Sequence, residues 1–136
     1  MCLYRPVRIT PEEDIKAYKV LKWKFGLRSP YHSDVEWKVG ERKTVEDTGY
    51  NHFEDHDPEG SLEKGVLHCC KYQIDAENIA HTLNETAEKY GYPEGFYVVY
   101  ECIIPKDSRF IFEGFGSPSG WDHYASSDLI INEQIY

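Results

Sequence analysis

The chain has 136 residues, a formal net charge of -9, and aromatic residues at 15% of its composition. A chain of this length forms one domain and buries a core without needing disulfides or a structural metal. The acidic excess argues against a protein that reads the phosphate backbone of nucleic acid, because such proteins carry clustered lysine and arginine. Eleven tyrosines, six phenylalanines and three tryptophans favour half-buried strands over a helical bundle. We therefore expect residues 1–136 to form a single α+β domain.

The start of the chain, MCLYRPVRITPEED, has charges and a proline where a signal peptide needs an apolar core. No window approaches the run of about 18 apolar residues that a membrane helix requires. We therefore expect a protein without a membrane segment, located in the cytoplasm of a bacterial host. Its four cysteines lack the spacing of a disulfide framework, so we expect them to be reduced.

The first third of the chain predicts short strands. Residues 2–9 predict an opening strand, and residues 10–13 predict the start of a brief helix, with a threonine N-cap followed by proline. Residues 17–25, AYKVLKWKF, alternate apolar and basic side chains, which is typical of a half-exposed strand that a glycine ends. Residues 27–39 are expected to be a second extended segment, which Pro30 breaks and Gly40 ends in a turn. The acidic, glycine-containing stretch 41–64 is then too long for a simple hairpin and is expected to be a functional loop.

The stretch Gly65–Leu83, GVLHCCKYQIDAENIAHTL, predicts a strand, a turn and an amphipathic helix from Asp75 to about Tyr90. Further strands are predicted at residues 96–104, 109–113 and 128–136, with a Gly/Ser/Pro loop around Trp121 before the last. Together these elements predict a mixed or antiparallel sheet of roughly five to seven strands with one main helix.

Five segments follow one another in a recurring order: MCLYRP, KAYKVLK with LRSPYH and EWKVGE, GVLHCCKYQIDAENIA, IPKDSRFIFEG and YASSDLIINEQIY. In this order they resemble a large family of small uncharacterised proteins of bacteriophages and prophages. The resemblance covers most of the chain and implies a phage or gut-bacterial origin. The family has no settled activity, and the long acidic loop 41–64 departs from its more compact members.

The block Gly65–Ala80 and Glu133 near the C-terminus also resemble the ADP-ribosyltransferase fold, which binds NAD between split sheets. This resemblance implies that Glu133 polarises the ribose hydroxyl and stabilises an oxocarbenium-like centre. It implies that Arg5 or Arg28 orients the dinucleotide. In the alternative interpretation, Glu133 is an outward position on a terminal strand and Arg5 is a surface charge. NAD is a cofactor only under the transferase interpretation, and otherwise none is expected.

His52 and His56 have the spacing H-x3-H, and His68 with Cys70 completes a set of four side chains that suits zinc. The competing interpretation is structural, with the cysteines as small core side chains and His68 hydrogen-bonded. On a strand, Cys69 points away from the face that carries His68 and Cys70. We adopt the structural interpretation and expect no metal.

Several aromatic side chains are candidates for recognition, because rings in loops on a rigid sheet often contact partners. They are Tyr50, Phe53, Trp121, Tyr31 and, with them, His32. Alternatively, the rings of Tyr50, Phe53 and Trp121 fold back over the sheet edge.

The function that we predict is that of a small non-catalytic accessory protein of phage type. It binds a host protein or a small nucleotide-like ligand, and a role in countering host defence belongs to this hypothesis. The alternative is an NAD-dependent enzyme similar to ADP-ribosyltransferases. Nucleic acids and membranes are not expected as partners.

Overall fold

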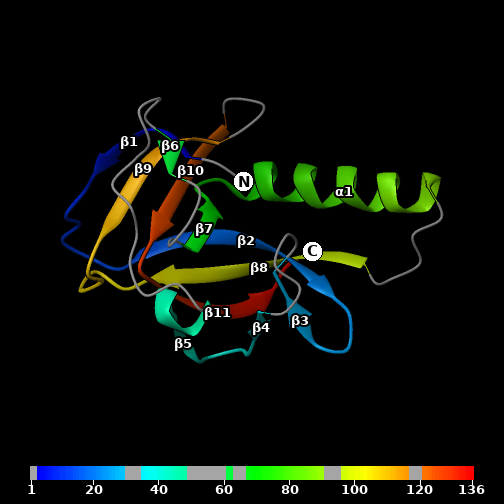
Figure 1. The fold of residues 1–136 in the computed structure, drawn as a ribbon, viewed down its shortest axis with the longest axis horizontal. Coiled ribbons are helices and arrows are strands. Elements are labelled where there is room, and N and C mark those ends of the chain that lie inside the picture. The colour runs from blue at the N-terminus through cyan, green and yellow to red at the C-terminus, as the bar shows by residue number, and fades with distance from the viewer. Residues whose placement is uncertain (1–2, 30–34, 49–60, 63–66, 91–95, 117–120) are drawn as a thin grey trace.

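The computed structural model describes residues 3–29, 35–48, 61–62, 67–90, 96–116 and 121–136. In these residues one α-helix packs on one sheet, in the α+β class that the sequence predicts (Figure 1). All strand pairs among them are antiparallel. No described helix is long and apolar enough to cross a membrane.

The sheet is built from longer strands and several very short ones. Those with four or more residues are β1 (Leu3–Arg8), β2 (Ile15–Trp23), β7 (Leu67–Cys70), β8 (Phe96–Ile104), β9 (Ile111–Gly116), β10 (Trp121–Ser126) and β11 (Asp128–Gln134). The shorter ones are β3 (Leu27–Arg28), β4 (Glu36–Trp37), β5 (Arg42–Thr44) and β6 (Ser61–Leu62). The helix α1 spans Gln73–Lys89, and a 3-10 helix, η1, spans Val45–Thr48. The described sheet has eleven strands, more than the roughly five to seven that the sequence predicts, mainly because two- and three-residue strands leave no readable pattern.

The strand order is β5-β11-β8-β2-β7-β10-β9-β1-β6, and β3 and β4 extend from β2. β2 and β8 pair along their whole length, from Ile15 with Ile104 to Trp23 with Phe96. By contrast, β2 and β7 pair at a single position, Tyr18 with Cys70. This narrow junction divides the sheet into two parts.

The helix covers one face of the sheet. Ala76, Ile79 and Ala80 of α1 are buried against Val20 of β2 and Val99 of β8. The predicted apolar face of the helix is therefore confirmed, and its predicted span of 75–90 is close to the observed one. In Figure 1, α1 runs along the upper side of the molecule, beside the strands that it contacts.

The opposite face holds the larger core. It contains Leu21, Trp37, Cys69, Tyr100, Cys102, Phe110, Ile111, Tyr124, Leu129 and Ile131, among others. Cys69 belongs to this core and Cys70 to the smaller core under the helix, so the two neighbours point to opposite faces as predicted. Cys69, Cys70 and Cys102 are free, buried thiols.

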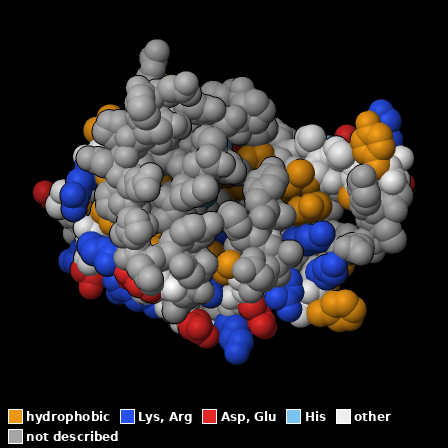
Figure 2. Space-filling view, in the orientation of Figure 1, with side chains coloured by type: hydrophobic (Ala, Val, Ile, Leu, Met, Phe, Trp, Pro, Cys, Tyr) orange, Lys and Arg blue, Asp and Glu red, His pale blue; other side chains and the backbone are white. Residues whose placement is uncertain are grey.

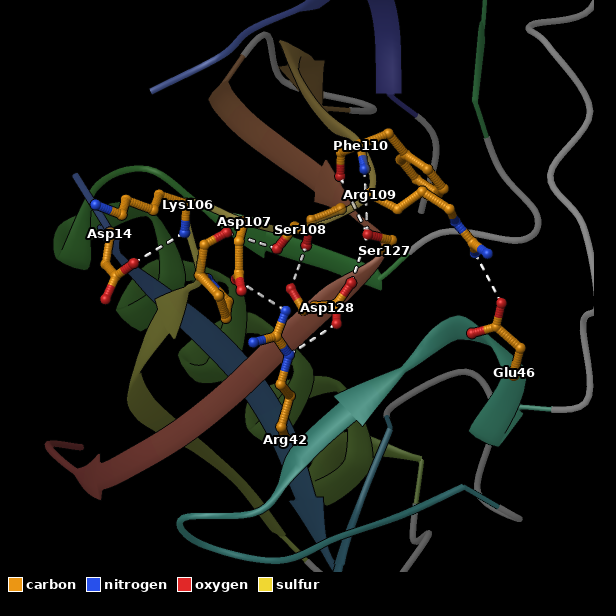
Figure 3. A network of polar contacts seen from close by, with 12 residues as sticks. Asp14, Arg42, Glu46, Lys106, Asp107, Ser108, Arg109, Phe110, Ser127 and Asp128 are labelled. Atoms are coloured by element: carbon orange, nitrogen blue, oxygen red, sulfur yellow. Dashed lines mark hydrogen bonds and ion pairs between the residues drawn. The ribbon is translucent and has the colours of Figure 1, made fainter. Parts of the chain in front are cut away.

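The chain passes from β10 in one part of the sheet to β11 in the other through Ser127 (Figure 3). The backbone of Ser127 donates to the carbonyl of Phe110 and accepts from the N–H of Val45, at 3.1 and 3.0 Å. Its hydroxyl donates to Asp128 at 2.6 Å and accepts from the N–H of Phe110 at 3.2 Å. Ser127 and Phe110 are buried, so these hydrogen bonds leave no unpaired backbone N–H or carbonyl of Ser127 in the core where the chain turns from β10 to β11.

The same corner fixes β5 to the sheet. The guanidinium of Arg42 donates to Asp128 at 2.8 Å and to Asp107 at 3.0 Å (Figure 3). Just beyond β5, Glu46 forms an ion pair with Arg109 at 2.8 Å. These contacts hold the outward side of β5, so the next side chain along it, Lys43, points towards the core.

Within residues 27–39, the described parts form two short strands, one before and one after the predicted break at Pro30. Two other predictions about the elements are wrong. Residues 10–13 form a bend and not a helix, because the connection between β1 and β2 is too short for a helix to propagate. Trp121, which the sequence places in a loop, begins β10.

In β2, Val20 and Leu21 are buried as the alternation predicts, but the position of Lys19 differs from the prediction. The pattern places Lys19 on a solvent face, but the structure puts it between Ala17 and Leu21 on the buried face, with only 8% of its surface exposed. Both faces of β2 are covered near its middle, so basic residues are not confined to one exposed side.

Candidate functional site

The most unusual surface feature is the hairpin between β2 and β3. Trp23 pairs with Leu27, and Lys24, Phe25 and Gly26 form the turn between them. Phe25 and Gly26 both have positive φ angles, 52° and 115°. Glycine accepts this conformation freely, whereas a residue with a Cβ is strained there. We call residues 22–28 the hairpin tip.

Arg28 holds this turn in place. Its Nε donates to the carbonyl of Lys24 at 3.0 Å, and its Nη2 lies 3.5 Å from the carbonyl of Phe25. The backbone N–H of Lys24 also donates to the carbonyl of Gly26 at 2.9 Å. The left-handed conformation of Phe25 is therefore supported by several contacts.

The turn places Phe25 in solvent, with 91% of its surface exposed. Trp23 and Phe96 are partners in the β2–β8 ladder and are 46% and 53% exposed. The side-chain amide of Asn84 in α1 bonds both backbone groups of Tyr97, at 2.7 and 3.0 Å, which fixes the start of β8. The hairpin tip therefore carries one projecting ring, that of Phe25. At its base, Trp23 and its ladder partner Phe96 contribute two half-exposed rings on a fixed strand pair.

The tip is basic in an acidic protein. Residues 15–33 contain no aspartate or glutamate, and Lys22, Lys24 and Arg28 fall within the tip. In the β3–β4 pair, the partner of Arg28 is Glu36, an exposed acidic residue just outside the hairpin tip. In Figure 2, basic and hydrophobic side chains occur together at the lower right, where Figure 1 shows the end of β2 and β3.

A cysteine–histidine pair lies in the interior. The Sγ of Cys70 and the Nε2 of His123 are 3.4 Å apart, and both residues are almost fully buried. Burial, and then the neighbouring Cys69, raise the pKa of the Cys70 thiol far above its usual value. A nucleophilic cysteine needs a depressed pKa and access to substrate. The Cys70 thiol is therefore protonated, and its contact with His123 belongs to the core.

The predicted metal ligands are only partly described. His52 and His56 lie outside the described residues. His68 and Cys70 lie on β7, and the described parts of the chain contain no group of three or more side chains that could hold a metal ion.

The residues implied by the transferase resemblance are not brought together. Glu133 lies exposed on β11, and Arg28 lies on β3 with its guanidinium bonded to turn carbonyls. Strands β8 and β2 lie between them, so their backbones are separated by about 14 Å across the sheet. They are also offset by about 13 Å along it, since Glu133 aligns with Tyr18 and Arg28 with Lys22. Arg5 lies on β1, and its side chain is not among those described.

The predicted recognition residues fall largely outside the described structure. Tyr31, His32, Tyr50 and Phe53 are in the undescribed segments, and only the backbone of Trp121 is described. Sequence reasoning missed Phe25, because it continues the apolar–basic alternation of residues 17–25. The adjacent Gly26 was the available signal for a tight turn.

No protein-family model, curated protein or solved structure matches this chain. The candidate site therefore depends on its own geometry, charge and exposure.

Proposed function

We propose that the protein is a small non-catalytic binding protein of phage type that docks on an acidic host protein through the hairpin tip. The observation that carries this proposal is Phe25, a large apolar ring that is 91% exposed on a backbone with φ of 52°. A left-handed backbone costs a residue with a Cβ about 1–2 kcal/mol. Hairpin turns usually place glycine, asparagine or aspartate at such positions. Strain of this kind is concentrated at functional sites.

The surroundings of Phe25 favour a protein as the partner. Aromatic residues and arginine dominate the energetics of protein interfaces, and the half-exposed Trp23 and Phe96 are ladder partners at the base of the turn that carries Phe25. Lys22 and Lys24 complement an acidic surface. A long polyanion would extend beyond the tip and meet the rest of the chain, which is acidic, since the whole chain carries a net charge of -9 even with the basic tip included. A compact acidic surface with a pocket for one ring avoids that repulsion.

Site-specific photocrosslinking tests the proposal in the bacterial host. A benzophenone amino acid replaces Phe25, and a matched protein carries it at Phe115, a 46% exposed phenylalanine on β9. We expect a discrete adduct with an acidic protein from position 25 and none from position 115. Lys22→Glu with Lys24→Glu should abolish the adduct, and the purified complex should weaken as salt is raised, because salt screens exposed charges.

Three results contradict the proposal. They are no adduct from position 25, equal adducts from both positions, and an adduct that the double charge reversal leaves unchanged.

A further inference from the structure

Two buried lysines meet at one tryptophan inside the larger core. The Nζ atoms of Lys19 and Lys43 lie 5.2 and 5.3 Å from the ring centroid of Trp37. Each lysine is 8% exposed, and Trp37 is 2% exposed. The indole N–H of Trp37 donates to the hydroxyl of Ser29 at 2.7 Å, which fixes the orientation of the ring.

The fold brings these side chains together from distant strands. Lys19 lies on β2 and Lys43 on β5, with β11 and β8 between them in the sheet. Lys43 is the ladder partner of Leu129, which is fully buried in the larger core. Lys19 shares the face of Leu21, which belongs to the same core. Both ammonium groups therefore reach over the same face of the sheet towards Trp37.

Within the described parts of the chain, the positive charges of Lys19 and Lys43 have little compensation. Lys19 donates to the carbonyl of His68 at 2.6 Å. The ammonium group of Lys43 forms no hydrogen bond or ion pair with the described part of the chain, and no described carboxylate pairs with either lysine. Contact with an aromatic ring returns about 0.5–2 kcal/mol per cation. Removing an ammonium group from water costs several kcal/mol, so the ring alone does not offset the burial of both charges.

Nearby thiols do not supply the missing negative charge. Cys69 and Cys70 are the neighbours of Lys19 on β7. The contact with Cys102, together with burial, raises the pKa of Cys69 well above its usual value. Burial likewise raises the pKa of Cys70. Both thiols are therefore neutral at pH 7.

We propose that Lys19, Lys43 and Trp37 form a binding site for a phosphate-sized oxyanion, either free or as the terminal phosphate of a nucleotide. The separation of the two ammonium groups is at most the sum of their distances to the ring centroid. A phosphate that accepts a hydrogen bond of about 2.8 Å from each ammonium group holds the two nitrogen atoms roughly 5 to 8 Å apart. A diphosphate bridges a larger separation between the two nitrogen atoms. Lysine binds phosphate as a point charge, so two lysines suffice without a bidentate arginine.

Calorimetric titration of the full chain tests the site with phosphate, pyrophosphate and ATP as the compounds added. We expect at least one of them to bind, with Lys43→Gln weakening the affinity at least tenfold and Lys43→Arg retaining most of it. Lys38→Gln is the matched control, because Lys38 is exposed and lies next to Trp37 in the chain. Binding of phosphate alone indicates a free ion, and preference for ATP indicates a nucleotide.

Nuclear magnetic resonance of the unaltered protein provides a second test that does not depend on the folding of variants. Each of the three tryptophans gives one indole N–H signal. The signal of Trp37 should shift on addition of the bound compound, and that of Trp23 should not. The proposal is overturned if none of the three compounds binds at millimolar concentration. It is also overturned if Lys43→Gln and Lys38→Gln bind equally well, or if the Trp37 signal stays in place at saturation.

Discussion

Lys19 and Phe25 lie on the same hairpin, and each occupies an environment that its side chain disfavours. The ammonium of Lys19 is buried, and the ring of Phe25 is in solvent. Lysine is rarely fully buried without a charged partner, and a residue with a Cβ rarely adopts a left-handed backbone. Here the backbone of Phe25 is strained, so both residues are better explained by binding than by folding.

The pH dependence of stability tests the burial of Lys19. Burial lowers the pKa of Lys19 below 10.5 in the folded protein. Between the folded and unfolded pKa values the unfolded chain holds the extra proton, so this residue makes stability rise with pH. Cys69 and Cys70 act in the opposite sense, because their folded pKa values are raised above 9.0. Above about pH 9 the unfolded thiols ionise first and stability falls.

Lys19→Met removes the contribution that rises with pH. Its unfolding free energy, measured with urea from pH 8 to 10.5, should therefore fall more steeply than that of the wild type. Each group contributes a slope of at most about 1.4 kcal/mol per pH unit. Identical slopes for the two proteins would contradict the desolvated charge of Lys19.

At the scale of elements, Asn84 links the helix to the strand that supports the hairpin tip. Its amide donates to the carbonyl of Tyr97 and accepts from the N–H of the same residue. Asn84→Ala leaves both backbone groups without these bonds, and each bond is worth about 1 kcal/mol. We expect a loss of about 2 kcal/mol in the free energy of unfolding, measured with urea.

Glu85→Ala is the matched control on α1. Among the described residues, the ion-pair partner of Glu85 is His81, and both side chains are exposed. Such pairs contribute about 0.5 kcal/mol or less. A loss from Asn84→Ala no larger than that of the control would show that the amide does not hold β8.

The sequence predicts α1 and β8 well because each carries a long, continuous pattern. The helix has apolar residues at helical spacing, and residues 96–104 are almost all β-formers. The strand β10, with sequence WDHYAS, was missed because polar residues interrupt it, and its His123 is nonetheless buried. The burial of a polar side chain depends on which strands become neighbours, and a local pattern does not contain that information.

The two candidate sites were missed for the same reason. Lys19 meets Lys43 and Trp37 only because β5, β11, β8 and β2 are neighbours in that order. The exposure of Phe25 depends on the strand ending at Trp23, two residues before the alternating pattern stops. Strand ends are set by turn geometry and the bonds of Arg28, which single-sequence patterns resolve poorly.

At the scale of the whole molecule, charge is distributed unevenly. The total is -9, yet the stretch 15–33 holds five basic residues, Lys16, Lys19, Lys22, Lys24 and Arg28, and no acidic ones. Because the hairpin tip is basic and the rest of the protein is acidic, the electric field of an acidic partner orients the protein so that the tip faces the partner. The same asymmetry disfavours docking on a partner through other surfaces of the chain.

The central claim is that the hairpin tip is shaped for contact with a partner and not for the stability of the fold. The most direct measurement is the free energy of unfolding of Phe25→Asn in urea, because asparagine tolerates a left-handed backbone. We expect this variant to be as stable as the wild type or more stable by up to about 1 kcal/mol. Leu21→Ala, a core position on the same strand, should lose about 2–5 kcal/mol. A loss for Phe25→Asn comparable to that of Leu21→Ala would contradict the claim, because the ring would then be holding the fold together.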